Sequence, residues 1–135
     1  MTSWTRELPP DGSSPGTARR WLREQLASNA SSTEVELADL ELCLSELVSN
    51  AVLHAGTDCR VQVTLRSGRV RVAISDGDTR RLPTMQAYDE TAVTGRGLHL
   101  VERLSARWGV EIDADTKTVW FEIDRTPAAD GTAPV

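Results

Sequence analysis

The chain has 135 residues, a formal net charge of -5 and a hydrophobic fraction of 39%. This length suits one domain with a single core. The acidic balance argues against nucleic acid as a direct partner, because phosphate binding usually leaves a basic footprint. The sequence has no apolar stretch long enough to cross a bilayer and no basic amphipathic helix, so no membrane partner is expected.

The first residues and the two cysteines indicate a cytoplasmic location. Residues 1–11 carry charges and prolines in place of the apolar run of a secretory signal. Cys43 and Cys59 lack the spacing of a disulfide framework or of a zinc site. Cys43 lies in an apolar helical run, which predicts that it is buried as a small hydrophobic residue.

A short edge strand and a helix are predicted first along the chain. Residues 4–8 form the strand, and residues 9–16 have the composition of a turn and loop. Thr17 is the predicted N-cap of a helix that runs over residues 18 to about 28. Apolar residues recur in this helix every four positions, which is typical of one buried face.

The next predicted helix is the longest. It begins with a predicted capping box, in which the Thr33 side chain accepts a hydrogen bond from a backbone N–H at the helix start, and the Glu36 side chain reaches back to the backbone N–H of Thr33. Gly56 is expected to end it. Its apolar stripe has helical spacing and consists of Leu37, Leu40, Leu44, Leu47, Val48, Ala51 and Val52.

A β-hairpin follows this helix. Val61, Val63 and Leu65 alternate with polar residues, as do Val70, Val72 and Ile74, and Ser67-Gly68 forms the turn between the two strands. The opposite face of both strands is polar or charged. The pattern therefore predicts a sheet that is covered on one side only.

The last part of the chain contains a long connection, a helix and a second hairpin. Residues 77–94 have no periodicity, and so long a connection is usually functional or mobile. A helix is predicted from residue 98 to about Trp108, and Gly109 is expected to stop it. Residues 110–113 and 117–124 predict the second hairpin.

These elements predict an α+β fold, a two-layer α/β sandwich with helices on one face of a mixed, largely antiparallel sheet. The predicted division of the chain has three parts. Residues 1–16 form the N-terminal strand and loop, residues 17–125 form the domain, and residues 126–135 form a disordered tail rich in Pro, Ala and Gly.

Glu46, Asn50 and His54 stand at i, i+4 and i+8 on one shoulder of the longest predicted helix. An Asn side chain offers a neutral oxygen to a hard cation such as Mg²⁺, and a Glu can accept a proton or orient water. Taken alone, this pattern is also that of the solvated polar shoulder of an ordinary amphipathic helix.

Asp76 closes a predicted strand and precedes Gly77. A carboxylate in this position can accept a hydrogen bond from an exocyclic amine such as that of adenine. Asp-Gly is also a common turn dipeptide, so an ordinary turn is the alternative interpretation.

Gly95, Arg96 and Gly97 precede the start of the next predicted helix. Glycines let the backbone approach an anion closely, the helix N-terminus adds N–H donors, and Arg96 adds a cation. The segment matches neither the dinucleotide-binding fingerprint nor the phosphate loop of nucleotide triphosphatases.

Four segments in this order resemble the N, G1, G2 and G3 boxes of the GHKL ATPases. They are LSELVSNAVLHAG (44–56), ISDGD (74–78), TGRGLHLVERLSARWGV (94–110) and KTVWFEI (117–123). This superfamily joins gyrase, a heat-shock chaperone, histidine kinases and MutL. The short stand-alone form resembles the bacterial anti-sigma-factor serine/threonine kinases of actinomycete type, over roughly residues 17–124.

The resemblance implies a role for each matched position. Glu46 would be the general base, and Asn50 would bind the Mg²⁺ that bridges the phosphates. Asp76 would accept from the adenine amine, and Thr118 would help to hold Asp76 and the base. The phosphates would be wrapped by a lid that contains Gly95, Arg96, Gly97 and Leu98, with residues 79–94 as its mobile part.

One box departs from the family pattern, which is often D-x-G-x-G. Asp78 and Arg80 stand where the two glycines are expected. Asp78 brings a negative charge close to a site for phosphates. This departure bears on nucleotide affinity and turnover more than on adenine recognition by Asp76.

Two functions follow from the resemblance. The first is an ATP-binding anti-sigma-factor-like regulator that acts as a serine/threonine kinase on an anti-anti-sigma (STAS) partner. The alternative is a non-catalytic nucleotide-binding or sigma-sequestering module, which the altered G1 box favours. Related kinases dimerise near the N-terminus, so the strand at residues 4–8 is expected to pair in a homodimer.

Overall fold

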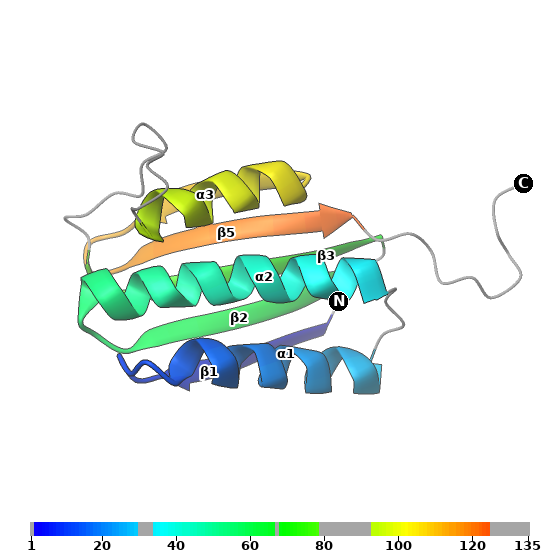
Figure 1. Cartoon of the computed structure of the whole chain (residues 1–135), viewed down its shortest axis with the longest axis horizontal. Coiled ribbons are helices and arrows are strands. Elements are labelled where there is room, and N and C mark those ends of the chain that lie inside the picture. The colour runs from blue at the N-terminus through cyan, green and yellow to red at the C-terminus, as the bar shows by residue number, and fades with distance from the viewer. Residues whose placement is uncertain (1, 30–33, 67, 79–92, 125–135) are drawn as a thin grey trace, which may run out of the picture.

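The computed structural model describes residues 2–29, 34–66, 68–78 and 93–124 of the chain (Figure 1). The elements follow the predicted order of strand, helix, helix, hairpin, helix and hairpin. They are β1 (Thr2–Leu8), α1 (Ser14–Asn29), α2 (Glu34–Asn50), the π-helical segment η1 (Ala51–Ala55), β2 (Cys59–Arg66), β3 (Arg69–Asp76), α3 (Val93–Leu104), β4 (Arg107–Ile112) and β5 (Lys117–Asp124).

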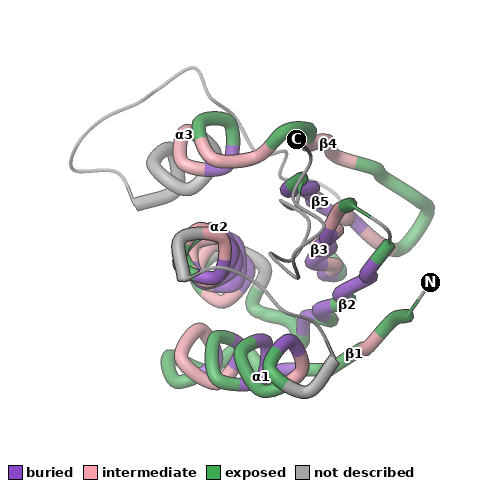
Figure 2. Tube along the Cα trace, turned by 90° about the vertical axis from the view of Figure 1, so that its right-hand side faces the viewer, coloured by how far each residue is buried: buried purple, intermediate pink, exposed green. Residues whose placement is uncertain are grey.

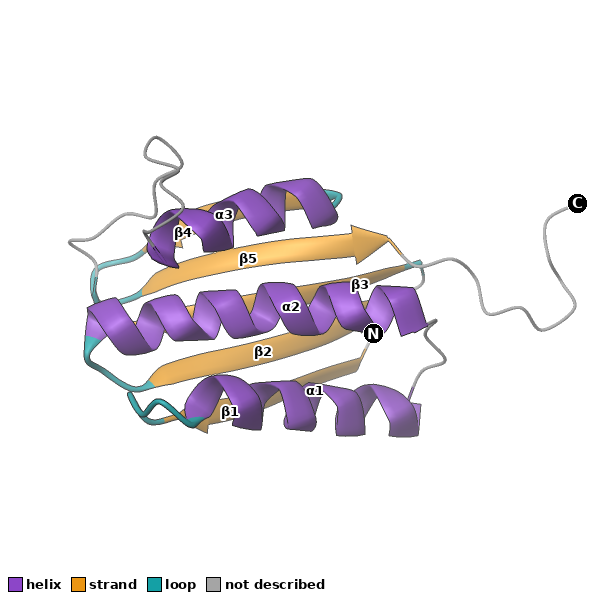
Figure 3. Cartoon of the chain, in the orientation of Figure 1, coloured by secondary structure: helices purple, strands orange, loops and turns teal. Residues whose placement is uncertain are grey.

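In the described part of the chain, the sheet has five strands in the order β1-β2-β3-β5-β4. Every pair of neighbouring strands is antiparallel, so the expected mixed sheet contains no parallel pair. The three α-helices form a second layer over one face of the sheet (Figures 2 and 3). The predicted α+β two-layer sandwich is therefore confirmed.

The core lies between the two layers, and alternation along the strands supplies its sheet side. Residues at every second position of β2, β3 and β5 point toward the helices and are buried: Val61, Val63, Leu65, Val70, Val72, Ile74, Val119, Phe121 and Ile123. The helices contribute one apolar stripe each, which includes Leu22, Leu26, Leu40, Leu44, Val48 and Val101. None of the described helices is long and apolar enough to span a membrane.

The start of α1 differs from the prediction. The helix begins at Ser14, so Thr17 lies inside its first turn and is not the N-cap. The hydroxyl of Thr17 donates to the carbonyl of Ser13 at 3.1 Å, as serine and threonine commonly do within helices. The preceding turn is held by Asp11 Oδ1, which accepts from the Ser13 N–H at 2.8 Å. The predicted cap of α2, Thr33, lies outside the described residues.

The end of α3 also differs from the prediction, because the helix ends at Leu104 and Gly109 lies inside β4. Gly109 pairs with Trp120 of β5. A Cβ atom at Gly109 would lie 2.8 Å from the Trp120 ring, closer than any real contact. This glycine therefore permits the close approach of an aromatic ring and does not stop a helix.

The face of the sheet without helices carries charged side chains. Glu122 lies 2.7 Å from Arg107 and 3.5 Å from Arg69. The Arg71 guanidinium lies 4.4 Å from the centre of the Trp120 ring. Trp120 therefore packs on this open face, while Phe121, the next residue, points into the core.

Cys43 and Cys59 are free thiols and both are buried, as predicted for Cys43. Burial is the main cause that raises the pKa of Cys43 from 9.0 to about 12, with the charges of Asp39 and Glu46 adding to it. Burial likewise raises the pKa of Cys59 from 9.0 to about 11, with help from the charge of Asp76.

Both thiols should therefore resist Ellman's reagent at pH 8 in the folded protein, since the thiolate is the reactive form. Both should react once the chain is unfolded in urea. The folded pKa values exceed the unfolded value of 9.0, so the stability that these thiols confer is complete below pH 9 and is lost as the pH rises toward 11 and 12. Rapid modification of either cysteine in the folded protein would contradict this placement.

Candidate functional site

Glu46 and Asn50 lie one turn apart at the C-terminal end of α2, and both are half-buried. The α-helical hydrogen-bonding pattern ends at Asn50, and the chain continues as the π-helical η1 up to Gly56, whose φ is 64°. Gly56 thus ends the helix as predicted, in the left-handed conformation that glycine favours. Single π-turns in helices are frequent at functional sites. His54 falls in η1, and its side chain is outside the described residues.

Asn50 has the feature that most directly indicates a ligand. Its side-chain Oδ1 is buried and has no hydrogen-bond partner among the described residues. Leaving a buried acceptor unpaired costs about 1–3 kcal/mol, so native proteins rarely do so without a reason. A neutral amide oxygen is a ligand that Mg²⁺ accepts, and the residues present therefore fit this cation.

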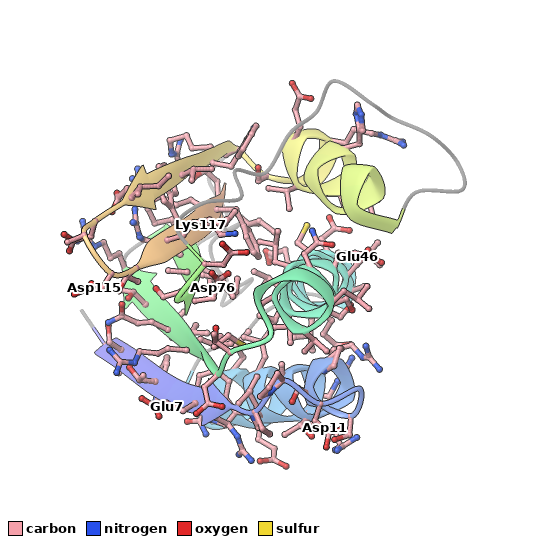
Figure 4. The ribbon with its side chains drawn as sticks, turned by 90° about the vertical axis from the view of Figure 1, so that its left-hand side faces the viewer. Glu7, Asp11, Glu46, Asp76, Asp115 and Lys117 are labelled. Atoms are coloured by element: carbon pink, nitrogen blue, oxygen red, sulfur yellow. The ribbon has the colours of Figure 1, made fainter. Side chains whose placement is uncertain are left out.

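Asp76 closes β3 on the face that the helices cover, and its side chain is only 6% exposed. Its Oδ1 accepts from the backbone N–H of Asp78 at 2.8 Å. Its Oδ2 lies 3.7 Å from the ammonium nitrogen of Lys117, the first residue of β5. Asp76 and Lys117 point toward one another from neighbouring strands, on the side of the sheet that faces α2 (Figure 4).

The structure does not bring Thr118 to Asp76. In the register of β3 and β5, Thr118 pairs with Ser75 and Lys117 pairs with Asp76. The hydroxyls of Thr118 and Ser75 lie 2.7 Å apart on the open face of the sheet. Successive strand residues point to opposite faces, so the residue that reaches Asp76 is Lys117.

Lys117 was not among the predicted site residues, although the sequence carries a signal for it. The apolar alternation of Val119, Phe121 and Ile123 extends back to Lys117 with the same period of two. A lysine that continues a buried face is unusual, because lysine is almost never fully buried unless it is paired.

The predicted glycine loop is part of a helix. α3 begins at Val93, so Gly95, Arg96, Gly97 and Leu98 lie in its first two turns. Each glycine costs a helix about 1 kcal/mol relative to alanine, and packing of the helix face that carries the buried Val101 offsets this cost. The helix start still presents N–H groups without intrahelical partners. The side chains of residues 95–98, and all of residues 79–92, are outside the described residues.

A cavity of about 220 Å³ opens beside Asp76 at this end of the sheet. It is lined by Glu7, Asp58, Cys59, Arg60, Ser75, Asp76, Gly77 and Thr116. Asp76 is the one predicted site residue among them, and none of the lining residues belongs to α2. The cavity therefore extends from Asp76 toward β1 and β2, and it does not delimit the space next to Glu46 and Asn50.

Comparisons with known proteins identify the domain. Residues 8–123 match the model of the histidine kinase-like ATPase domain. An uncharacterized protein of Streptomyces coelicolor is 36% identical to this chain over 98 residues, which cover 64% of this chain and 93% of that protein.

The structure of the RsbU and RsbW domains of Rv1364c from Mycobacterium tuberculosis superposes with a TM-score of 0.72 over 95% of this chain, at 23% identity. The chain spans about a third of that longer chain, since it covers 34% of it. At this identity, the likeness shows a common fold. The family match covers most of the sequence, and it shows that this chain belongs to the histidine kinase-like ATPase domains, as the resemblance of its four boxes to the GHKL ATPases predicts.

Proposed function

We propose that this chain binds Mg·ATP between the end of α2 and Asp76 and acts as a serine/threonine kinase on an anti-anti-sigma (STAS) partner. The observation that carries this proposal is the buried Oδ1 of Asn50, one helical turn after Glu46, which has no hydrogen-bond partner in the part of the chain that the structure describes. Membership of the histidine kinase-like ATPase family supports ATP as the ligand.

In this proposal, each residue holds a different part of the nucleotide. Asn50 offers its amide oxygen to Mg²⁺, and Asp76 accepts from the exocyclic amine of adenine. The phosphates lie at the start of α3, where Gly95 and Gly97 let the backbone come close and the helix N-terminus favours negative charge. When bound, ATP would supply its γ-phosphoryl group, with ADP as the leaving group, and Mg²⁺ would neutralise the charge on the phosphate oxygens.

Glu46 is proposed to act on the partner's hydroxyl. It accepts the proton of the attacking serine or threonine, while the neighbouring residues position the reactants. The resemblance of the four boxes to anti-sigma-factor kinases also suggests a sigma factor as a second partner, in the cytoplasm. β1 is an edge strand of the sheet and is the proposed site of homodimer contact.

A second candidate is a module that binds nucleotide or sequesters a sigma factor without transferring phosphate. Asp78 supports it, since this half-buried acidic residue is anchored to the site by its N–H bond to Asp76 at 2.8 Å. An added negative charge near the phosphates weakens their binding and opposes turnover. Transfer of labelled phosphate to a STAS protein distinguishes the two candidates.

Titration of the full chain with ATP, with and without Mg²⁺, tests the proposed site. Asn50→Ala should lose the Mg²⁺-dependent part of the affinity, because the variant lacks the amide oxygen. Asp76→Ala should weaken ATP binding about 10- to 100-fold, the range expected for a hydrogen bond to a charged group. Isothermal titration calorimetry measures both effects.

Thr118→Val is the matched control, because Thr118 lies on the open face of the sheet and should leave ATP affinity unchanged. Circular dichroism of each variant checks that the fold persists. The site is wrong if the wild-type chain and the Asn50 and Asp76 variants all bind ATP equally, or if none of them binds it.

A further inference from the structure

Lys117 and Asp76 form a buried ion pair at the site proposed for the base. The two side chains are 10% and 6% exposed, and Lys117 Nζ lies 3.7 Å from Asp76 Oδ2. They are register partners at the ends of β5 and β3. A lysine at a strand end could extend into water, but this one turns its ammonium toward the carboxylate at the cost of desolvation.

The choice of lysine is itself informative. The sequence contains 15 Lys and Arg residues together, and Lys117 is the only lysine among them. An ammonium is a compact charge with three rotatable donors, whereas a guanidinium is a broad planar group. At this one buried position, the chain therefore carries the more compact of the two cations, which occupies less space beside the carboxylate.

The Asp76 carboxylate directs one oxygen to a backbone N–H and the other toward the Lys117 ammonium. Asp76 Oδ1 accepts from the N–H of Asp78 at 2.8 Å. The distance from Oδ2 to Lys117 Nζ, 3.7 Å, is longer than a hydrogen bond. Oδ2 can therefore accept from a ligand while the ammonium stands beside it, so the site presents an acceptor next to a donor.

We propose that Lys117 recognises the base together with Asp76 and makes the site selective for adenine. The inference rests on the proposed function, which supplies the nucleotide. The adenine amine is a donor flanked by two ring acceptors, N1 and N7. Asp76 accepts from the amine, and the Lys117 ammonium donates to one of the flanking nitrogens. Guanine carries an oxygen in place of the amine, so in the same pose Asp76 faces an acceptor.

A double-mutant cycle between the side chain and the base tests this contact. We would titrate the wild-type chain, Lys117→Met and Lys117→Arg with ATP, 1-deaza-ATP and 7-deaza-ATP, in which CH replaces N1 or N7. The wild-type chain should bind one of the two analogues about tenfold more weakly than ATP, as expected for loss of a hydrogen bond to a charged donor. Lys117→Met should bind that analogue and ATP equally, and Lys117→Arg should keep part of the difference.

The cycle separates base recognition from a structural role, because the ratio of the affinities for ATP and for each analogue is measured within one variant. If Lys117 served only to balance the charge of Asp76, Lys117→Met would weaken all three nucleotides equally and keep the wild-type ratios. That result, or a wild-type chain that does not distinguish ATP from either analogue, would overturn the inference and leave the proposed function intact. A wild-type chain that binds no ATP would instead overturn the proposed function and the inference with it.

A second measurement uses the single lysine. Lys117 carries the only side-chain amine of the sequence, so stable acetylation by a water-soluble acylating reagent is expected there and at a terminal amine, and fragment mass spectrometry of the peptide that holds Lys117 reports on this residue. Saturating Mg·ATP should slow its acetylation several-fold, because the base covers the ammonium. Glu24→Gln, on the exposed side of α1, is the control and should show the same protection. A rate that ATP does not change in a chain shown to bind ATP contradicts the contact.

Discussion

Replacing Glu46 by glutamine is expected to lower the rate of phosphoryl transfer to a STAS partner about 100- to 10,000-fold, the usual contribution of a positioned general base. Glutamine has the size and shape of glutamate, but it cannot take the proton of the attacking hydroxyl. In the proposed mechanism, Glu46 acts on that hydroxyl and Asn50 holds the cation, so the affinity for Mg·ATP should stay nearly unchanged. A fall in kcat without a matching rise in KM for ATP is the expected signature.

Asp39→Asn is the matched control for this variant. Asp39 is half-buried and lies on α2 two turns before Glu46, so the substitution removes the same charge from the same helix. Its rate should remain close to that of the wild-type chain. Equal rates in Glu46→Gln and the wild-type chain would remove Glu46 from the reaction, even if ATP binding at Asn50 and Asp76 is confirmed.

Replacing Phe121 by alanine is expected to destabilise the domain by about 3–5 kcal/mol, the range measured for large aromatic deletions in cores. Phe121 is fully buried in β5 between the sheet and the helices. The ring leaves a cavity that close-packed neighbours fill only in part. Domains of this kind are stable by about 5–15 kcal/mol, so the loss is a large share of the total. Urea unfolding followed by tryptophan fluorescence measures it.

Trp120→Ala is the control, because Trp120 is larger than Phe121 but lies on the open face of the sheet. Its contact with Arg71 at 4.4 Å is a cation–π interaction, which contributes about 0.5–1 kcal/mol at an exposed site. A greater loss of stability for Trp120→Ala than for Phe121→Ala would mean that β5 is shifted by one residue. The same shift would turn Thr118 toward the helices and Lys117 toward the open face. The experiment therefore also tests the β3–β5 register, on which the proposed adenine contacts of Asp76 and Lys117 depend.

Much of the fold could be predicted from hydrophobic periodicity. The stripe of α2 and the alternation of β2 and β3 each identify an element and the face that it buries, because burial of one face is what the period records. Element ends were less predictable. α1 begins at Ser14 because of the turn around Asp11, and Gly109 looks like a helix stop until its strand partner Trp120 is known. Both boundaries depend on contacts that sequence spacing does not contain.

The candidate site divides in the same way. The i, i+4 spacing of Glu46 and Asn50 and the position of Asp76 at a strand end are local features, so the sequence by itself was enough to propose these residues. The resemblance of its four boxes likewise predicted the family, which the match over residues 8–123 confirms. Only the tertiary structure decided that Asn50 Oδ1 is buried with no partner among the described residues, and that Lys117, rather than Thr118, faces Asp76. The physical reason is the period of two along a strand. The box motif identifies the segment that contains the neighbours Lys117 and Thr118. Only the pairing of β5 with β3 determines which of these two side chains points toward the helices.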